Sequence, residues 1–132
     1  MGSFRATLNF AGKDYDCLYS SYTLTRNVDA KGLVSSGVLG GTLTMRVEST
    51  DDDAIIDAMV TSQFKPIDGL LTFKKANEDS KMKTVEWKEG YVVSFRESFD
   101  ANDEKTATIL FTISAKTLIM GSATHENRWA EH

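Results

Sequence analysis

The stretch STDDDAIIDAMVTSQFKP, residues 49–66, is the clearest helical segment of the chain, and the sequence on either side alternates like β-strand. The hydroxyl of Ser49 or Thr50 can cap the first free amide groups of a helix. The three aspartates at 51–53 then place negative charge at the positive end of the helix dipole, and the closing proline blocks continuation. The pattern predicts one short helix over residues about 50–63.

One stripe of this helix is apolar and the remainder is polar, so the helix should cover a neighbouring structure instead of being buried on all sides. Helical spacing places four apolar residues on that stripe: Ile55, Ile56, Met59 and Val60. We expect them to close one mouth of a β-structure, with the acidic start left in water.

The flanking segments read as strands, because apolar and polar residues alternate in them with a period of two. The clearest case is the segment 107–115, in which Ala107, Ile109, Phe111, Ile113 and Ala115 share one face. The other predicted strands cover residues 4–10, 15–25, 38–48, 69–75 and 85–95. Six or seven strands with turn signals between them indicate a mainly β fold, a small barrel or a sandwich, in a single domain over 1–132.

The segment around residues 88–90 admits two interpretations. Val85 and Trp87 keep the same parity as Tyr91 across this point, which fits one long strand with a bulge at the glycine. The same parity fits a hairpin with a three-residue loop, and the pattern leaves both open.

Composition excludes several functions. The chain has 132 residues, a formal net charge of −4 and no basic run, which argues against binding nucleic acid or docking on an anionic membrane. A single cysteine cannot form an internal disulfide. The N-terminus lacks the pattern of a cleaved signal peptide, so we expect synthesis in the cytoplasm and, if the protein leaves the cell, export by another route.

No credible catalytic, cofactor or metal site is predicted. An EF-hand loop starting at Asp51 would need glycine and glutamate where Ile56 and Ser62 stand. The glycines at 37–41 lack the spacing of a phosphate loop, and close packing against a neighbouring chain segment explains them better. His125 and its neighbours supply too few ligands for a metal, and Cys17 fits a small core residue better than a nucleophile.

Two segments suggest contacts with another molecule. The loop 26–37 is longer than a hairpin needs, and loops of this length in compact domains are often functional. Its Leu33 and Val34 either tuck onto their own domain or touch another copy. The tail 121–132 is polar apart from Trp129, which we expect to pack against the domain or a neighbouring chain.

The ordered set of segments resembles a known family, the type VI secretion tube protein Hcp or TssD in its Bacteroidota form. The resemblance extends from Ser3 to about Trp129 and is carried by SFRATLNFAGKDYD, RNVDAKGLVSSGVLGGTL, VESTDDDAIIDAMVTSQFKPIDGLLTFKK, KMKTVEWKEGYVVSFRESFD and FTISAKTLIMG.

This resemblance implies a β-barrel with one helix packed against it and no enzymatic activity. Six copies would form a ring, rings would stack into a tube, and the partners would be sheath, spike and effector proteins. Loop length and the resemblance together select the expected self-association residues of the loop, which are Asn27, Asp29, Lys31, Leu33, Val34 and Ser35. Trp129 joins them as the apolar anchor of the polar tail. The competing hypothesis is a monomeric barrel that binds a small ligand in a wide apolar interior.

Overall fold

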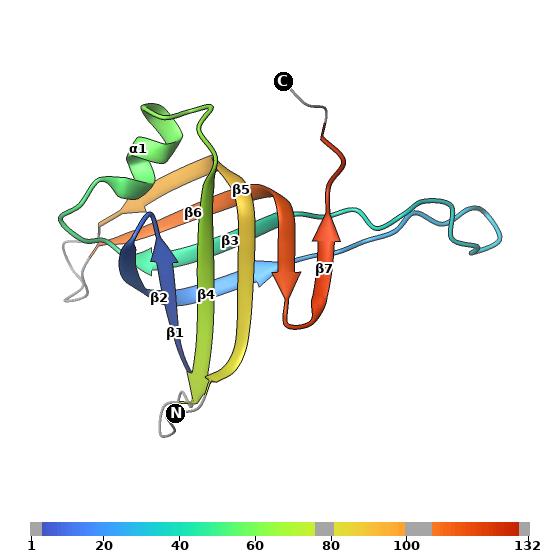
Figure 1. Ribbon diagram of the computed structural model, residues 1–132, viewed down its shortest axis with the longest axis horizontal. Helices are drawn as coiled ribbons and strands as arrows, with labels where there is room; N and C mark the ends of the chain where they lie inside the picture. Colours follow the sequence, from blue (N-terminus) through green and yellow to red (C-terminus); the bar gives the residue numbers. More distant parts are fainter. Residues whose placement is uncertain (1–3, 76–80, 100–106, 130–132) are drawn as a thin grey trace.

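A computed structural model describes residues 4–75, 81–99 and 107–129 (Figure 1). In chain order the elements are β1 (Phe4–Phe10), β2 (Lys13–Tyr22), β3 (Thr42–Glu48), α1 (Ala54–Val60), β4 (Ile67–Lys75), β5 (Lys81–Ser98), β6 (Thr108–Met120) and β7 (Ala123–Glu126).

The sheet closes on itself. Its strands are all antiparallel in the order β3-β2-β1-β4-β5-β6-β7, and an additional pairing of β3 with β6 closes six of them into a barrel. β6 is long enough to serve two partners along one edge: its first half pairs with β3, and its residues 117–120 pair with β7. The prediction of a mainly β fold is confirmed, and the barrel replaces the sandwich alternative.

Alternate residues of the strands fill the barrel interior. Trp87, Phe10 and Phe111 are its largest fully buried side chains. The ring of Phe10 lies 6.2 Å from that of Trp87 and 5.9 Å, edge-on, from that of Phe111. Such aromatic packing fills a six-stranded barrel with side chains. The wide apolar interior that a ligand-binding barrel requires is therefore occupied by the protein itself.

Two glycines make room for the central tryptophan. A Cβ atom on Gly69 would lie 2.1 Å from the Trp87 ring, and one on Gly90 would lie 2.5 Å from it. The indole Nε1 donates a hydrogen bond to the carbonyl of Ile67, 2.9 Å away. The largest side chain of the core thus lies over bare backbone and has its polar atom satisfied.

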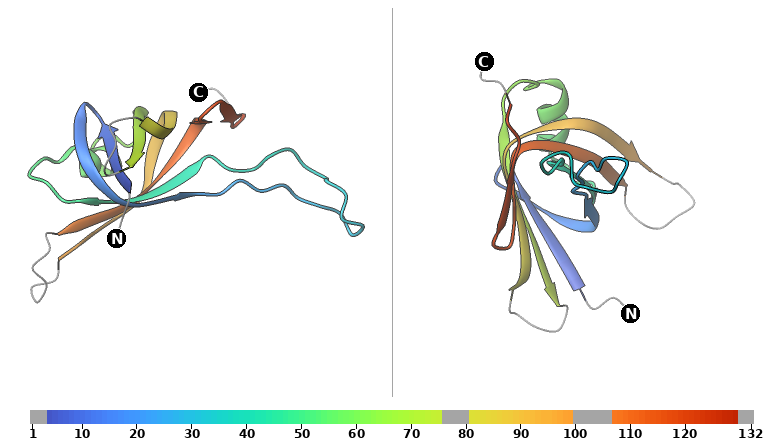
Figure 2. Two further views of the ribbon diagram at one scale, coloured as in Figure 1. Left: turned by 90° about the horizontal axis from the view of Figure 1, so that it is seen from below. Right: turned by 90° about the vertical axis from the view of Figure 1, so that its right-hand side faces the viewer.

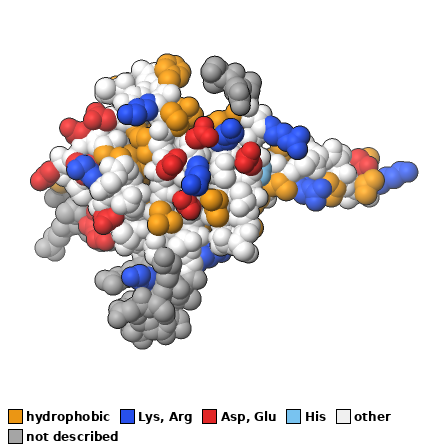
Figure 3. Space-filling view, viewed as in Figure 1, with side chains coloured by type: hydrophobic (Ala, Val, Ile, Leu, Met, Phe, Trp, Pro, Cys, Tyr) orange, Lys and Arg blue, Asp and Glu red, His pale blue; other side chains and the backbone are white. Residues whose placement is uncertain are grey.

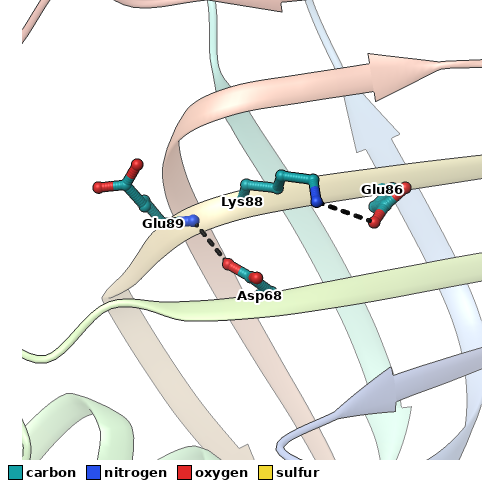
Figure 4. Close-up of polar contacts among 4 residues, drawn as sticks. All are labelled: Asp68, Glu86, Lys88 and Glu89. Atoms are coloured by element: carbon teal, nitrogen blue, oxygen red, sulfur yellow. Dashed lines mark hydrogen bonds and ion pairs between the residues drawn. The ribbon is translucent and has the colours of Figure 1, made fainter.

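The segment around residues 88–90 is one continuous strand with a bulge. Lys88 and Glu89 together face Asp68, because the register shifts between the pairs of β4 and β5 on either side. Glu89 takes a positive φ of 54°, and its amide donates to the Asp68 carboxylate at 2.9 Å (Figure 4). Lys88 forms a 3.8 Å ion pair with Glu86. The interpretation as one long bulged strand is confirmed and the hairpin is wrong, but the bulge lies at Lys88 and Glu89 instead of at the glycine.

The helix is shorter than predicted. It spans Ala54–Val60 instead of about 50–63, and its N-cap residue is Asp53, which makes no side-chain capping bond. The carboxylate of Asp52 accepts the amide of Ala54 at 3.0 Å, while the hydroxyl of Ser49 donates to Glu97. The predicted capping by Ser49 or Thr50 is wrong, because the Ser49 hydroxyl bonds Glu97 on β5 and the Thr50 hydroxyl bonds Asp52.

The apolar stripe is also narrower than predicted. Ile55 and Ala58 are the buried helix residues, and Met59 packs against the core from a partly buried position. Ile56 is 40% exposed and Val60 is more exposed still, so their expected burial is wrong. The helix contacts the barrel along β5, at the mouth shown in Figure 1, and one row of side chains is enough for that contact.

The segment 121–132 is not merely a tail. Its residues Ala123–Glu126 form β7, and His125 within that strand is buried. In the described residues, no helix combines the length and apolar character that a membrane crossing requires.

Candidate functional site

The chain between β2 and β3 forms a projecting arm, which we define as residues 23–41. Its two limbs run antiparallel and meet at isolated bridges between Thr25 and Leu39 and between Val28 and Val34. Thr25 and Leu39 exchange both backbone hydrogen bonds, at 2.9 and 2.6 Å. The predicted loop 26–37 is therefore an ordered ribbon, and Figure 2 shows it extending well beyond the barrel.

The tip of the arm is held by Asp29. Its Oδ1 accepts the amides of Lys31 and Leu33, each at 2.9 Å, and its own amide donates to the Leu33 carbonyl. Gly32 completes the turn with a φ of 84°, which glycine adopts without strain. Asp29 thus has a clear local role in shaping the tip, distinct from the contact with another molecule that the sequence suggested for it.

Asn27 and Ser35 join the two limbs below the tip. The amide of Ser35 donates to the Asn27 carbonyl at 2.8 Å, and the amide of Asn27 donates to the hydroxyl of Ser36 at 2.8 Å. These bonds fix the spacing of the limbs, so the side chains between them are presented from a stable backbone.

Apolar side chains of the arm face solvent. Leu33 is 69% exposed, and the other exposed hydrophobic residues of the arm are Leu24, Val28, Val34, Val38 and Leu39. Figure 3 shows hydrophobic side chains interspersed with Lys and Arg along the arm. The alternative in which Leu33 and Val34 tuck onto their own domain is wrong. These exposed apolar residues on an ordered ribbon make the arm the candidate interaction surface of the chain.

Trp129 lies on a different surface from the arm. Its ring lies 5.9 Å from that of Tyr91 on β5, so it packs against its own domain. Together with Met59, Phe64 and Val93 it lines an open groove of about 1070 Å³ beside the helix. The structure thus separates the sequence-predicted residues into the arm, which holds six of them, and this groove, which holds Trp129.

Sequence reasoning missed several exposed apolar residues around the groove. Phe64, just after the helix, is 88% exposed, and Val93 on β5 is also exposed. Alternation alone places Val93 on the same face as the buried Val85 and Trp87. The bulge at Lys88 and Glu89 reverses the two faces of β5, so Val92 is buried and Val93 is exposed. Nothing in the sequence distinguishes Phe64 from a residue that folds back onto the helix.

The start of the helix carries the clearest electrostatic network. The buried hydroxyl of Tyr15 donates to the Asp52 carboxylate at 2.5 Å. Burial, and then the nearby carboxylate, raise the pKa of Tyr15. Burial alone would raise the pKa of Asp52, but hydrogen bonds from Thr50, Tyr15 and the amide of Ala54 outweigh it and lower that pKa. The network fastens the helix start to β2.

The chemistry of the remaining candidate residues is limited. Cys17 is half-buried, and burial raises the pKa of its thiol, which reduces the thiolate fraction needed for nucleophilic attack. Over residues 4–75, 81–99 and 107–129, no cluster of three His, Cys, Asp or Glu residues is placed to hold a metal ion. The glycines at 40 and 41 lie against Leu24 and Asn127, as the packing interpretation predicts, but that interpretation is wrong for Gly37, which has open space around it.

Comparisons with known proteins agree with this geometry. The family described as "Hemolysin coregulated protein Hcp (TssD)" matches residues 2–130. The structure of Hcp1 from Flavobacterium johnsoniae is 36% identical, with a TM-score of 0.86 over 93% of this chain and 99% of that one. No curated protein sequence matches the chain.

More distant structures share the fold alone. Hcp1 from Salmonella typhimurium has a TM-score of 0.69 at 14% identity, covering 88% of this chain and 84% of that one. A chain of the sheath–tube complex of an extracellular contractile injection system has a TM-score of 0.55 at 17% identity, covering 90% and 89%. With a family match over nearly its whole length, the chain belongs to the Hcp (TssD) family, the non-enzymatic tube proteins of the type VI secretion system.

Proposed function

We propose that this chain forms hexameric rings that stack into a hollow tube, and that a contractile sheath expels the tube to deliver effectors, some of them held in the lumen. The protein acts by shape and self-association and carries out no reaction. It is exported through the type VI apparatus. Membership of the Hcp family supports the tube role. The exposed arm, the groove beside the helix and the open strand edges support the assembly.

The observation that carries the proposal is the exposed arm. An isolated barrel gains no stability from a projecting ribbon with apolar side chains in water. Contact with a second copy removes that apolar surface from water, and the ordered backbone reduces the entropy lost on binding. We assign Leu33 and Val34 to contact with a neighbouring copy, in the same ring or the next one. Lys31 adds a charged group at the tip.

The groove beside the helix supports a second contact. Trp129, Phe64 and Val93 expose apolar surface there, and Trp and Phe are among the residues that anchor protein interfaces. A closed ring needs two different surfaces on each subunit, because head-to-tail contacts join unlike patches. The arm and the groove are two such surfaces. The spike and effectors would then meet the assembled ring.

Open strand edges favour assembly as well. Within the described residues, β7 pairs only with β6, so its outer edge carries backbone groups that pair with no strand. Among the residues that the structure describes, β2 pairs with β1 only as far as Cys17, and the following residues of β2 have no strand partner on that side. Such edges are natural sites for pairing with another chain.

Negative-stain imaging of the purified chain tests the proposal. We expect annular particles with sixfold symmetry, and compact single barrels at high protein concentration would contradict it. Leu33→Asp should abolish the rings, because it places a charge in the arm contact. Leu33→Met keeps an apolar side chain and should retain them. Circular dichroism should show the same fold for both variants, since Leu33 lies outside the core.

A further inference from the structure

The arm leaves the barrel through two glycines that no functional assignment explains. Gly41 has a φ of 101°, and its carbonyl accepts the amide of Ala115 on β6 at 2.8 Å. A Cβ atom at Gly41 would lie 2.1 Å from Nδ2 of Asn127. The turn at the arm base therefore requires glycine both for its backbone angle and for the close approach of Asn127.

The side-chain amide of Asn127 joins three parts of the fold. Its Nδ2 donates to the carbonyl of Gly40 at the arm base and to the carbonyl of Ala115 on β6, each at 3.0 Å. Its backbone amide donates to the carbonyl of Lys116 at 2.7 Å. One residue after β7 thus ties the arm to the barrel wall.

The remaining atom of this amide is fixed by His125. Nδ2 of Asn127 faces two carbonyl oxygens, which only accept, so its Oδ1 is the acceptor of the group. His125 Nε2 lies 3.0 Å from that Oδ1 and therefore donates a proton to it. His125 is only 9% exposed, so the bond is shielded from water. The amide cannot rotate without losing these part-buried hydrogen bonds.

We propose that Asn127 is a positioning residue that sets the direction in which the arm leaves the barrel. It acts through the carbonyl of Gly40. The claim about direction concerns the single chain. Its consequence, that a misdirected arm cannot reach its neighbour, rests on the proposed function.

Asn127→Asp tests the claim with little change of shape. The substitution keeps the acceptor for His125 but replaces the donor with an oxygen that faces the carbonyls of Gly40 and Ala115. Both hydrogen bonds to these carbonyls are lost, and the carboxylate oxygen repels the carbonyl oxygens. The arm should therefore no longer hold its original direction, while the barrel stays folded. Glu126→Gln, a charge change at the neighbouring exposed position, is the matched control.

Single-molecule energy transfer reads the direction of the arm. Dyes are attached through Lys31→Cys at the tip and Lys13→Cys on the barrel, in a Cys17→Ser background, at dilutions where only single chains are present. We expect one narrow efficiency peak for the parent and the control, and loss of that single peak for Asn127→Asp. Thermal unfolding is measured alongside, because a merely structural residue would lower the melting temperature without moving the arm.

The outcomes separate the two levels of the proposal. An unchanged narrow peak in Asn127→Asp overturns the positioning role, whether or not the protein forms rings. A lost peak with rings at parental abundance supports positioning and overturns its consequence for assembly. If Asn127→Asp does not fold, Asn127→Ala, which deletes the same bonds without adding charge, is expected to lose the narrow peak, and an unchanged peak overturns the role.

Discussion

Replacing Ile55 or Ile56 by alanine should have very different effects, although the two residues are adjacent in the same helix. Ile55 is 2% exposed and belongs to the core, whereas Ile56 is 40% exposed. Truncating a buried isoleucine removes its transfer free energy and leaves a cavity, at a cost of about 2–5 kcal/mol. Truncating one on the surface costs about 0.5 kcal/mol, and the partial burial of Ile56 raises this to about 1 kcal/mol.

Urea unfolding followed by circular dichroism measures the difference. The midpoint should fall strongly for Ile55→Ala and slightly for Ile56→Ala, with the same slope, because both variants expose the same surface on unfolding. Measuring at two protein concentrations separates subunit stability from assembly. Equal losses, or a larger loss for Ile56→Ala, would refute the packing of the helix on β5.

Two further predictions concern the barrel. Tyr15→Phe removes a hydrogen bond to Asp52 and should lower the free energy of unfolding at pH 7 by about 1.5 kcal/mol. The pKa of Asp52 is lower in the folded chain than in the unfolded chain. Its contribution to the free energy of unfolding is therefore full above the ordinary pKa of about 4 and is lost as the pH falls through the lowered pKa. The stability difference between the parent and Tyr15→Phe should shrink in that range, and a constant difference in acid titrations would contradict the network. Gly69→Ala presses a methyl group on the Trp87 ring and should cost at least about 1–3 kcal/mol, whereas Gly37→Ala, with open space around it, should be nearly neutral; equal melting temperatures would disprove the close packing.

The strands were predictable because burial imposes a period of two. Leu43, Met45 and Val47 on β3 are buried as the alternation indicates, and so are Ile109 and Phe111 on β6. Only the pairing of β3 with β6 decides between barrel and sandwich, and that pairing joins residues far apart in the chain. Alternation cannot report such a contact.

The errors at the helix also have physical causes. Helical periodicity predicted that the helix has an apolar stripe, but it could not predict the width of the buried part. That width depends on how many rows of helix side chains reach β5. Asp52 bonds the Ala54 amide and Tyr15, and this tertiary bond moves the helix start past Ser49 and Thr50. β7 was missed because four residues are too few to show a period.

The candidate site was predictable only in part. Length and composition indicated the arm, but the exposure of Leu33 depends on the limbs pairing with each other instead of folding onto the barrel. The network around Asn127 joins residues from the arm base, β6 and the segment after β7. No local pattern connects those positions.

The mass of the assembly in solution tests the central claim most directly. Sedimentation velocity over a range of concentrations near physiological salt should give a species of six times the 14.6 kDa chain mass, with larger stacked species as concentration rises. A single species of one chain mass throughout the range would contradict the account of this protein as a self-assembling tube subunit.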